Sequence, residues 1–317
     1  MSRALIIGGA GFVGEHLAAH LCACGDTVYV TKLPQETFRL PDVQTCDLDI
    51  LDAAALRELL RSLAPAHIYH LAAQSSVGLS WEKPALTIDI NVKGACNVLQ
   101  ALAENKSTAR LLLIGSGEEY GYIRPGESPI GEDGPLRPGN VYAVTKAAQN
   151  MLGAVYAKAY GLDVMCTRAF NHIGPGQRPG FVLPDFCKRV AQIEAGLCEP
   201  VLHVGNLEAE RDFTDVRDVV RAYRLLMEKG AAGETYNVGS GSAIAVQTLL
   251  DQVLALAKAQ IRVMQDPARM RPADVPRIEA DTRKIFAATG WRPEIPLETT
   301  VAQCLDAWRA DVRQAQK

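Results

Sequence analysis

The residues most able to do chemistry in this chain are a tyrosine and a lysine four positions apart, Tyr142 and Lys146. Apolar residues recur around them at helical spacing, so both side chains are expected on one face of a helix. A free phenol has a pKa of about 10, and a nearby cation favours the phenolate and lowers that pKa. The pair therefore predicts proton transfer to or from a substrate hydroxyl, beside a hydride transfer. Because Y-x-x-x-K alone is common on surface helices, the assignment depends on other motifs.

A serine and a glutamate follow the strand expected at residues 111–114, at Ser116 and Glu118. In open parallel sheets, ligands bind beyond the carboxyl ends of the strands, so Ser116 is expected where Tyr142 can meet it. A hydroxyl there can donate to the same substrate oxygen and orient it. Glu118 is either a loop carboxylate in water or a second acid/base group.

A glycine-rich turn near the N-terminus predicts a nucleotide site. An apolar strand at residues 4–7 leads into Gly8, Gly11 and Gly14, and helical periodicity follows. Strand, G-x-x-G-x-x-G and helix is the order that a dinucleotide fingerprint requires. The glycines let the main chain approach the pyrophosphate, and the helix N-terminus supplies free N–H groups.

The end of the second expected strand, residues 27–31, bears on the choice of cofactor. About twenty residues past the first glycine, an acid would favour NAD, whereas a cation accommodates a 2′-phosphate. This chain has Thr31 and Lys32 there, so NADP(H) is favoured, NAD(H) is possible, and Lys32 is alternatively a solvated loop residue. A carboxylate after the third strand, residues 43–48, could bind the adenine amine or cap the next helix. The other expected cofactor contacts are Phe12, Val13, Asp49, Ile50, Leu71, Ala72 and Ala73.

The order of elements predicts the fold. Strands alternate with helices through the first half, which indicates the α/β class and a Rossmann-type doubly wound parallel sheet. From about residue 175, Gly and Pro become frequent. We expect a cofactor-binding domain at residues 1–174 that carries the Ser, Tyr and Lys. A smaller α/β substrate-binding region, partly interleaved with the first, is expected at residues 175–317.

Two arginines of the second region, Arg211 and Arg271, are candidate clamps for a diphosphate, because guanidinium groups bind phosphate bidentately. Surface ion pairing with neighbouring Asp residues is the alternative.

Composition excludes several classes of protein. A net charge of −3 over 317 residues, without a basic block, argues against nucleic acid or an anionic membrane as the main partner. No apolar run is long enough to span a bilayer, and the first strand leads straight into the glycine motif, so a cytoplasmic protein is expected. The eight Cys are scattered without a C-x-x-C pair, which favours buried small hydrophobes over disulfides or zinc. His16 and His20 lack a third ligand, so no metal site is expected.

These motifs occur together in the order found in the extended short-chain dehydrogenase/reductase family, which the chain resembles over essentially its whole length. They are the glycine trio, His70-Leu71-Ala72-Ala73, Ser116, Tyr142 with Lys146, and Arg211-Asp212-Phe213. The chain is most similar to the branch of nucleotide-sugar epimerases, dehydratases and reductases. Residues 72–77, the Glu two positions after Ser116, and residues 271–275 resemble the GDP-mannose group of that branch.

The resemblance implies roles for single residues. Ser116, Tyr142 and Lys146 would form the catalytic triad, and Glu118 matches the acid/base of the dehydratases. Asp274 stands where the family usually has a Glu near the nucleotide ribose. The implied substrate contacts are Ser75, Glu118, Asn171, Arg211, Arg271 and Asp274.

The resemblance leaves two main reactions open. The favoured one is NADPH-dependent reduction of the 4-keto group of GDP-4-keto-6-deoxy-D-mannose to GDP-6-deoxy-D-mannose (GDP-D-rhamnose), a surface polysaccharide precursor. Residues 32–41 lack the Arg/Ser-rich loop of the dehydratases, and residues 170–177 resemble the reductases more closely. The alternative is GDP-mannose 4,6-dehydration through Glu118, or another nucleotide-sugar epimerase or reductase. Gly117 stands where the dTDP-glucose dehydratases have an Asp, so a dTDP-glucose substrate is disfavoured. A cofactor-binding scaffold without chemistry is disfavoured by the complete triad.

The family also implies a homodimer formed by the helix that bears Tyr142 and the long helix before it. Ala147, Met151, Val155 and Ala159 fit such an interface, and they fit burial within one subunit equally well.

Overall fold

A seven-stranded sheet forms the centre of the larger lobe. The computed structural model describes residues 2–41, 43–124, 126–269 and 275–316. The strand order is β10-β6-β5-β4-β1-β2-β3, and every neighbouring pair is parallel. Its strands are β1 (Arg3–Ile7), β2 (Thr27–Lys32), β3 (Gln44–Asp47), β4 (His67–His70), β5 (Arg110–Ser116), β6 (Val164–Ala169) and β10 (Thr235–Val238). The predicted Rossmann-type parallel sheet is thus confirmed.

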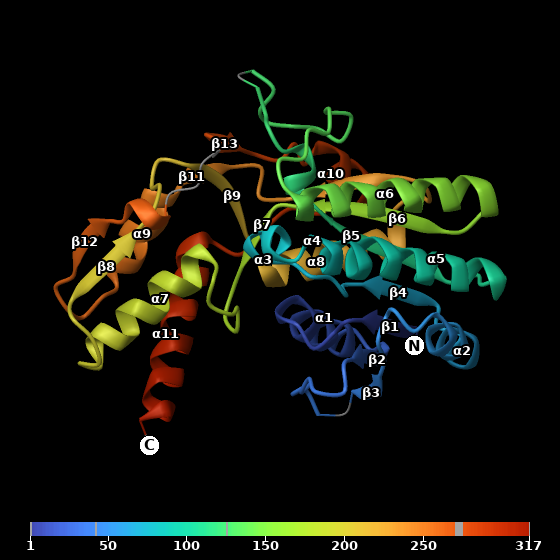
Figure 1. Cartoon of the computed structure of the whole chain (residues 1–317), viewed down its shortest axis with the longest axis horizontal. Helices are drawn as coiled ribbons and strands as arrows, with labels where there is room; N and C mark the ends of the chain where they lie inside the picture. Colours follow the sequence, from blue (N-terminus) through green and yellow to red (C-terminus); the bar gives the residue numbers. More distant parts are fainter. Residues whose placement is uncertain (1, 42, 125, 270–274, 317) are drawn as a thin grey trace.

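Helices cover both faces of this sheet (Figure 1). They are α1 (Phe12–Ala23), α2 (Ala53–Leu63), α3 (Val77–Glu82), α4 (Pro84–Ile88), α5 (Gly94–Glu104), α6 (Val141–Tyr160), α8 (Val216–Lys229) and α10 (Arg283–Thr289). Alternation along β1 explains the arrangement. Ala4 and Ile6 pack into one core with α1 and α8, whereas Leu5 and Ile7 pack into another with α2 and α5. Both faces of the sheet are apolar because successive side chains point to opposite faces.

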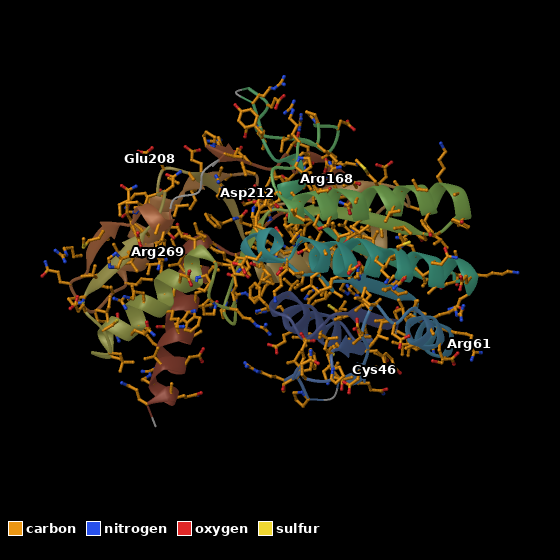
Figure 2. All side chains as sticks on the ribbon, viewed as in Figure 1. Cys46, Arg61, Arg168, Glu208, Asp212 and Arg269 are labelled. Carbon is orange, nitrogen blue, oxygen red and sulfur yellow. The ribbon has the colours of Figure 1, made fainter. Side chains whose placement is uncertain are left out.

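A smaller lobe lies at one end of the molecule (Figure 1). Its elements are β7 (Asn171–Ile173), α7 (Val182–Glu194), β8 (Val201–Val204), β9 (Glu210–Asp215), β11 (Ala243–Ala245), α9 (Val246–Ala255), β12 (Arg262–Gln265), β13 (Arg277–Ile278) and α11 (Leu297–Ala315). Helices α7, α9 and α11 share one apolar core. Figure 2 shows Glu208 and Arg269 on this lobe, whereas Arg61 and Cys46 lie on the larger one.

The chain crosses between the lobes more than once. After β9 it forms α8, which packs on α1, and then β10, which pairs in parallel with β6. Helix α10 packs on α8 and β10 before α11 returns to the smaller lobe. Residues beyond 174 therefore contribute to both lobes, and a functional division at that residue stays a prediction.

Two segments of the larger lobe are irregular. Residues 84–104 form α4, a π-helical turn η1 (Asp89–Lys93) and α5 in succession. This wide turn contains the buried Asn91. Its side-chain oxygen accepts from the Gln74 N–H, and its side-chain nitrogen donates to the Gln74 carbonyl and the Thr145 hydroxyl. The fourth strand ends at His70, because the main chain of the next residues bonds back to Ile7 instead of continuing the ladder.

The cysteine prediction is wrong in part. Cys166, Cys187 and Cys304 are buried, but Cys22 and Cys24 are exposed at the end of α1, on the side of the helix that does not face the sheet. Of the two histidines on α1, His16 donates to the Pro175 carbonyl at 2.9 Å, a contact between two distant segments. None of the helices in the described part of the chain is long and apolar enough to cross a membrane.

Two glycines after β1 are required by close contacts. Gly8 has φ of +79°, and a Cβ there would lie 2.5 Å from the Ala72 Cα, so the turns after β1 and β4 can touch only without a side chain. A Cβ on Gly14 would lie 2.2 Å from the Gly9 carbonyl oxygen, so α1 can start against the glycine turn. At Gly11 a Cβ would meet no atom within 4 Å.

We predict that Gly14→Ala lowers the free energy of unfolding by about 2 kcal/mol, because the new methyl group overpacks main chain that cannot move aside. Gly11→Ala, the matched control, should unfold close to wild type. Urea denaturation of both variants measures this, and equal stability of Gly14→Ala and Gly11→Ala would contradict the packing argument.

Candidate active site

One cavity of about 1300 Å³ lies at the carboxyl ends of the parallel strands, between the two lobes. All the expected site residues that the structure describes line it: Gly8, Gly11, Phe12, Val13, Gly14, Thr31, Lys32, Asp49, Ile50, Leu71, Ala72, Ala73, Ser75, Ser116, Glu118, Tyr142, Lys146, Asn171 and Arg211. Arg271 and Asp274 lie outside the described residues. The structure thus brings together side chains that are up to about 200 positions apart in the sequence.

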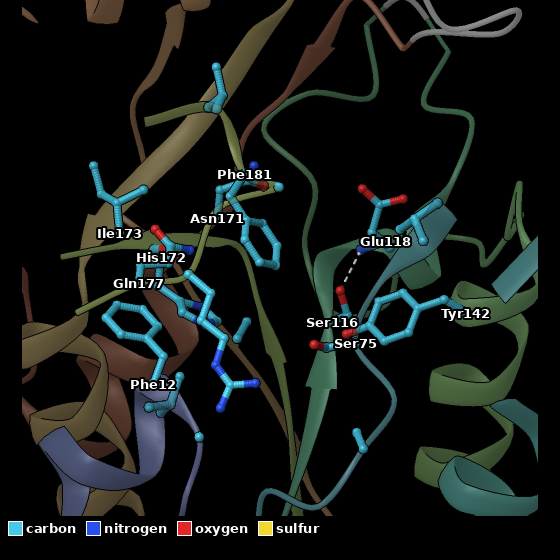
Figure 3. Close-up of a pocket in the computed structure, with 18 of the residues that line it drawn as sticks. Phe12, Ser75, Ser116, Glu118, Tyr142, Asn171, His172, Ile173, Gln177 and Phe181 are labelled. Atoms are coloured by element: carbon cyan, nitrogen blue, oxygen red, sulfur yellow. Dashed lines mark hydrogen bonds between the residues drawn. The ribbon is translucent and has the colours of Figure 1, made fainter. Parts of the chain in front are cut away.

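Ser116 and Tyr142 meet in this cavity. Ser116 is the last residue of β5, and Tyr142 lies in the first turn of α6, which packs against β5. Figure 3 shows the two side chains adjacent, and Ser116 is close enough to lower the pKa of Tyr142. The Ser116 oxygen also accepts from the Glu118 N–H at 3.2 Å. Two hydroxyls presented together can bind one substrate oxygen.

Lys146 lies one helical turn beyond Tyr142 and is almost fully buried. Its ammonium donates to the Ile114 carbonyl at 2.7 Å and to the Gln149 side chain at 3.2 Å. Burial lowers the pKa of Lys146 to about 8, and the charge of Glu119 opposes this shift. A cation is therefore held near the end of β5, one helical turn from Tyr142.

The expected lowering of the Tyr142 pKa is not what the structure gives. Burial raises this pKa above its ordinary value; the Ser116 hydroxyl lowers it, and the charges of Glu118 and Glu119 raise it further. The physical reason is that desolvation of a phenolate outweighs the favourable contacts, while the Lys146 ammonium is bound to the main chain of β5. Tyr142 is a protonated phenol near neutral pH.

Glu118 is a half-buried carboxylate at the edge of the same group (Figure 3). Its Oε2 accepts from the Asn140 side-chain amide at 3.1 Å. Asn140 is also the N-cap of α6, since its side-chain oxygen accepts from the Ala143 N–H at 2.8 Å. One residue therefore starts the helix that carries Tyr142 and holds the carboxylate beside it.

The glycine turn has the geometry of an anion site. The Gly8 N–H donates to the Thr31 hydroxyl at 3.0 Å, which joins β1 to the end of β2. The N-cap of α1, Gly11, makes no side-chain hydrogen bond, and residues 11–14 face the cavity. Free N–H groups and the positive end of a helix dipole fit a dinucleotide pyrophosphate. The missing Cβ atoms at Gly8 and Gly14 let this turn pack against the main chain of Ala72 and Gly9.

The end of β2 carries an ion pair. The Lys32 ammonium lies 2.5 Å from an Asp47 oxygen of β3, and Lys32 is therefore not a free loop residue. Of the carboxylates after the third strand, Asp52 caps α2, whereas Asp49 accepts from the Leu51 N–H at 2.9 Å and lines the cavity with Ile50.

The opposite wall of the cavity comes from the smaller lobe. Arg211 on β9 donates to the carbonyls of Glu210 and Val275, both at 2.8 Å. Asn171 on β7 lies across the cavity from Ser116, as Figure 3 shows. The neighbouring Asp212 is buried and binds the Ser240 and Gly241 N–H groups, which fixes β9.

The sequence prediction missed a polar wall of the cavity, formed by α7, the loop before it, β8 and the 3₁₀ turn η3 (Pro267–Arg269). Its members are Arg178, Lys188, Arg189, Gln192, His203 and Arg269. A signal was present, since Asp185, Lys188 and Gln192 recur at helical spacing on a helix with an otherwise apolar face. This wall adds positive charge where a substrate phosphate would be bound.

Comparisons with known proteins agree with this geometry. The family model described as GDP-mannose 4,6 dehydratase matches residues 5–304. The chain is 35% identical to GDP-6-deoxy-D-mannose reductase of Pseudomonas aeruginosa, over 98% of this chain and 99% of the reductase. It is 28% identical to GDP-mannose 4,6-dehydratase of Vibrio cholerae, over 99% and 95% of the two chains. The solved structure described as RMD from Pseudomonas aeruginosa complexed with NADPH has a TM-score of 0.88 and 33% identity, covering 98% of this chain and all of that one.

Proposed function

The chain belongs to the GDP-mannose 4,6-dehydratase family, and on that basis we propose that it is an NADPH-dependent reductase of a nucleotide sugar. Its substrate would be GDP-4-keto-6-deoxy-D-mannose and its product GDP-6-deoxy-D-mannose (GDP-D-rhamnose), a precursor for surface polysaccharide. The similarity to the Pseudomonas aeruginosa reductase over nearly the whole of both chains supports this substrate.

The observation that carries the proposal is the position of Ser116 and Tyr142, side by side in the cavity that the glycine turn also lines (Figure 3). Reduction of a ketone needs a proton donor beside the carbonyl, whereas oxidation of a hydroxyl, the first step of dehydration, needs a base. Burial raises the pKa of Tyr142, so the phenol is a donor at neutral pH. GDP-mannose 4,6-dehydration is the second candidate, because Glu118 lies beside Ser116 and Tyr142 in the position of a second base.

Each residue then has a role in the proposed reduction. NADPH supplies the hydride when it is bound. Ser116 and Tyr142 hydrogen-bond the 4-keto oxygen and orient it, and Tyr142 donates its proton to the developing alkoxide. Lys146 keeps a positive charge at this end of β5, which would help to bind the cofactor ribose. Residues 11–14 hold the pyrophosphate of the cofactor.

The substrate nucleotide would occupy the smaller lobe. We assign the diphosphate to Arg211 and the polar wall of the cavity, and sugar contacts to Ser75, Glu118 and Asn171. Residues 1–174 would be mainly the cofactor unit and residues 175–317 mainly the substrate unit, with β10 and α8 returning to the first.

Assembly and location complete the proposal. An apolar stripe on α6 includes Val144, Met151 and Val155, which are 50%, 58% and 58% exposed, and Trp81 on the adjacent α3 is 63% exposed. A two-fold pairing of α6 would bury this stripe in a homodimer. A cytoplasmic location accords with the absence of a disulfide among the described residues.

NADPH oxidation tests the reaction. With GDP-4-keto-6-deoxymannose the wild-type protein should oxidise NADPH, and with GDP-mannose alone it should not. Tyr142→Phe should lose at least about a hundredfold in turnover because the proton donor is gone, while the affinity for NADPH stays near wild type. If a 4-keto product instead accumulates from GDP-mannose, and Glu118→Gln abolishes this, the protein is a dehydratase.

Lys32 should discriminate between the cofactors. Its ammonium is the cation that can bind a 2′-phosphate, so Lys32→Ala should weaken NADPH binding by about tenfold and leave NADH binding little changed. Lys32→Arg, which keeps the cation, is the matched control. Fluorescence titration with both cofactors measures this, and equal losses for NADPH and NADH would remove Lys32 from the phosphate site.

The proposed dimer can be tested by adding charge to the stripe. The double variant Met151→Glu/Val155→Glu should sediment as a monomer, because carboxylates cannot be buried unpaired in an apolar interface. Phe286→Glu places the same charge on an equally exposed aromatic of α10 and should leave the dimer intact. Wild-type protein that sediments as a monomer would refute the assembly.

A further inference from the structure

A fully buried carboxylate lies directly behind the catalytic group. Glu119 follows Glu118 in the 3₁₀ turn η2 (Gly117–Tyr120) and has no solvent exposure. Its oxygens accept from the Ser116 N–H at 2.8 Å, from the Asn150 amide at 2.8 and 3.0 Å, and from the Arg168 Nε at 3.1 Å. A buried charge is tolerated only when it is paired and hydrogen-bonded in this way.

These bonds join three elements that carry or flank the catalytic side chains. Ser116 ends β5, Arg168 lies on β6, and Asn150 lies on α6 one turn beyond Lys146. The carboxylate therefore fixes the end of β5 against the helix that carries Tyr142 and Lys146.

The main chain is shaped to admit this carboxylate. A Cβ on Gly115 would lie 2.3 Å from the Glu119 Oε1, 2.4 Å from the Asn150 amide nitrogen and 2.2 Å from the Thr167 carbonyl oxygen. Glycine is unfavourable within a strand, so its presence in β5 follows from the space that the carboxylate and its partners occupy.

Arg168 is itself held in place by other groups. It donates to the Tyr120 hydroxyl at 3.0 Å and to the Glu132 carbonyl at 2.8 Å, and its guanidinium lies 4.8 Å from the Tyr120 ring centre. Figure 2 shows it near the start of α6. The ion pair with Glu119 is therefore part of a rigid network and not a mobile surface pair.

We propose that Glu119 is a positioning residue of the active site, which orients Ser116 toward α6 and places a fixed negative charge behind Tyr142 and Lys146. This inference rests on the proposed reductase function for its kinetic consequence, but the charge can be tested without turnover.

The charge acts on both groups of the pair on α6. Burial lowers the pKa of Lys146 to about 8, and the charge of Glu119 is what opposes that shift; the nearby His70 is neutral, since burial and Lys146 lower its pKa to about 3. Burial raises the pKa of Tyr142, and the charges of Glu118 and Glu119 raise it further.

Of the other titratable groups around these residues, Arg168 is a cation bound to Glu119, whereas Cys166 and Tyr223 are uncharged. Burial raises the pKa of Cys166, which faces Glu119, to about 12, and burial also raises the pKa of Tyr223, which faces Tyr142. Burial raises the pKa of Glu119 itself, whereas the Ser116 N–H, Arg168 and Asn150 lower it.

Removal of the Glu119 charge changes the pKa values of Tyr142 and Lys146 in the same direction. Without the negative charge, the pKa values of Tyr142 and Lys146 both fall. A reductase needs Tyr142 protonated, so its activity is lost as the pH rises through the pKa of Tyr142. Removal of the charge must therefore move the alkaline limb of the turnover profile to lower pH.

The first experiment compares Glu119→Gln with Glu132→Gln. Glu132 is a partly buried acid of the same region, and its side chain accepts a hydrogen bond from the Asn237 N–H. Glu119→Gln should lower kcat by about tenfold or more, leave the KM for NADPH near wild type, and move the alkaline limb to lower pH. Glu132→Gln should keep the wild-type profile.

The second experiment follows acetylation of Lys146 by acetic anhydride as a function of pH, by peptide mass spectrometry with Lys146→Arg as the blank. The first variant is Glu119→Gln. The second is the double variant Glu119→Leu/Arg168→Met, which replaces the ion pair by apolar groups and can be measured if the single variant does not fold. Half-maximal acetylation should occur at lower pH than in wild type.

A folded variant whose acetylation profile and kcat profile both match wild type would overturn the proposal. The acetylation readout needs no substrate. A shifted acetylation profile in a protein that does not reduce the keto sugar would therefore refute the reductase function and leave the role of Glu119 standing.

Discussion

Burial of the Lys146 ammonium is the constraint on which the rest of the site depends. A cation taken out of water must be bound, and here the Ile114 carbonyl at the end of β5 and the Gln149 amide bind it. This fixes the rotation of α6 about its own axis. Tyr142, four residues earlier, is then directed at Ser116, and the cavity acquires its catalytic wall. If the lysine at this position were exposed, no buried ammonium would fix which face of α6 packs against β5.

Local patterns were sufficient to predict the parallel sheet, the glycine turn and the residues that line the larger lobe's share of the cavity. These features depend on contacts between residues that are near in the sequence, or on the rule that the carboxyl ends of parallel strands meet at one edge of the sheet. The π turn at Asn91 was not predictable in this way, because it is defined by partners far along the chain. Polar residues at helical spacing on α7 were visible in the sequence, but the position of α7 at the cavity depends on the fold of the whole chain. The sign of the Tyr142 pKa shift was wrong for the same reason: burial is a property of the whole fold.

The two carboxylates after Ser116 show how adjacent residues can have different environments. Glu118 faces the cavity and is held by one amide, whereas Glu119 faces the interior and satisfies three partners. The 3₁₀ turn alternates them between solvent and core within one residue. Adjacent residues thus supply a carboxylate that faces the cavity, Glu118, and a buried carboxylate behind Tyr142 and Lys146, Glu119. We infer that this short segment affects both the reaction and its dependence on pH.

The position of β10 has a consequence for synthesis of the chain on the ribosome. All six residues of β6 are buried, and one edge of this strand is covered only when residues 235–238 pair with it. Until about three quarters of the chain has been made, a nascent polypeptide would expose an unpaired apolar edge, which is a template for aggregation. Completion of the seven-stranded sheet must therefore wait for synthesis of much of the smaller lobe.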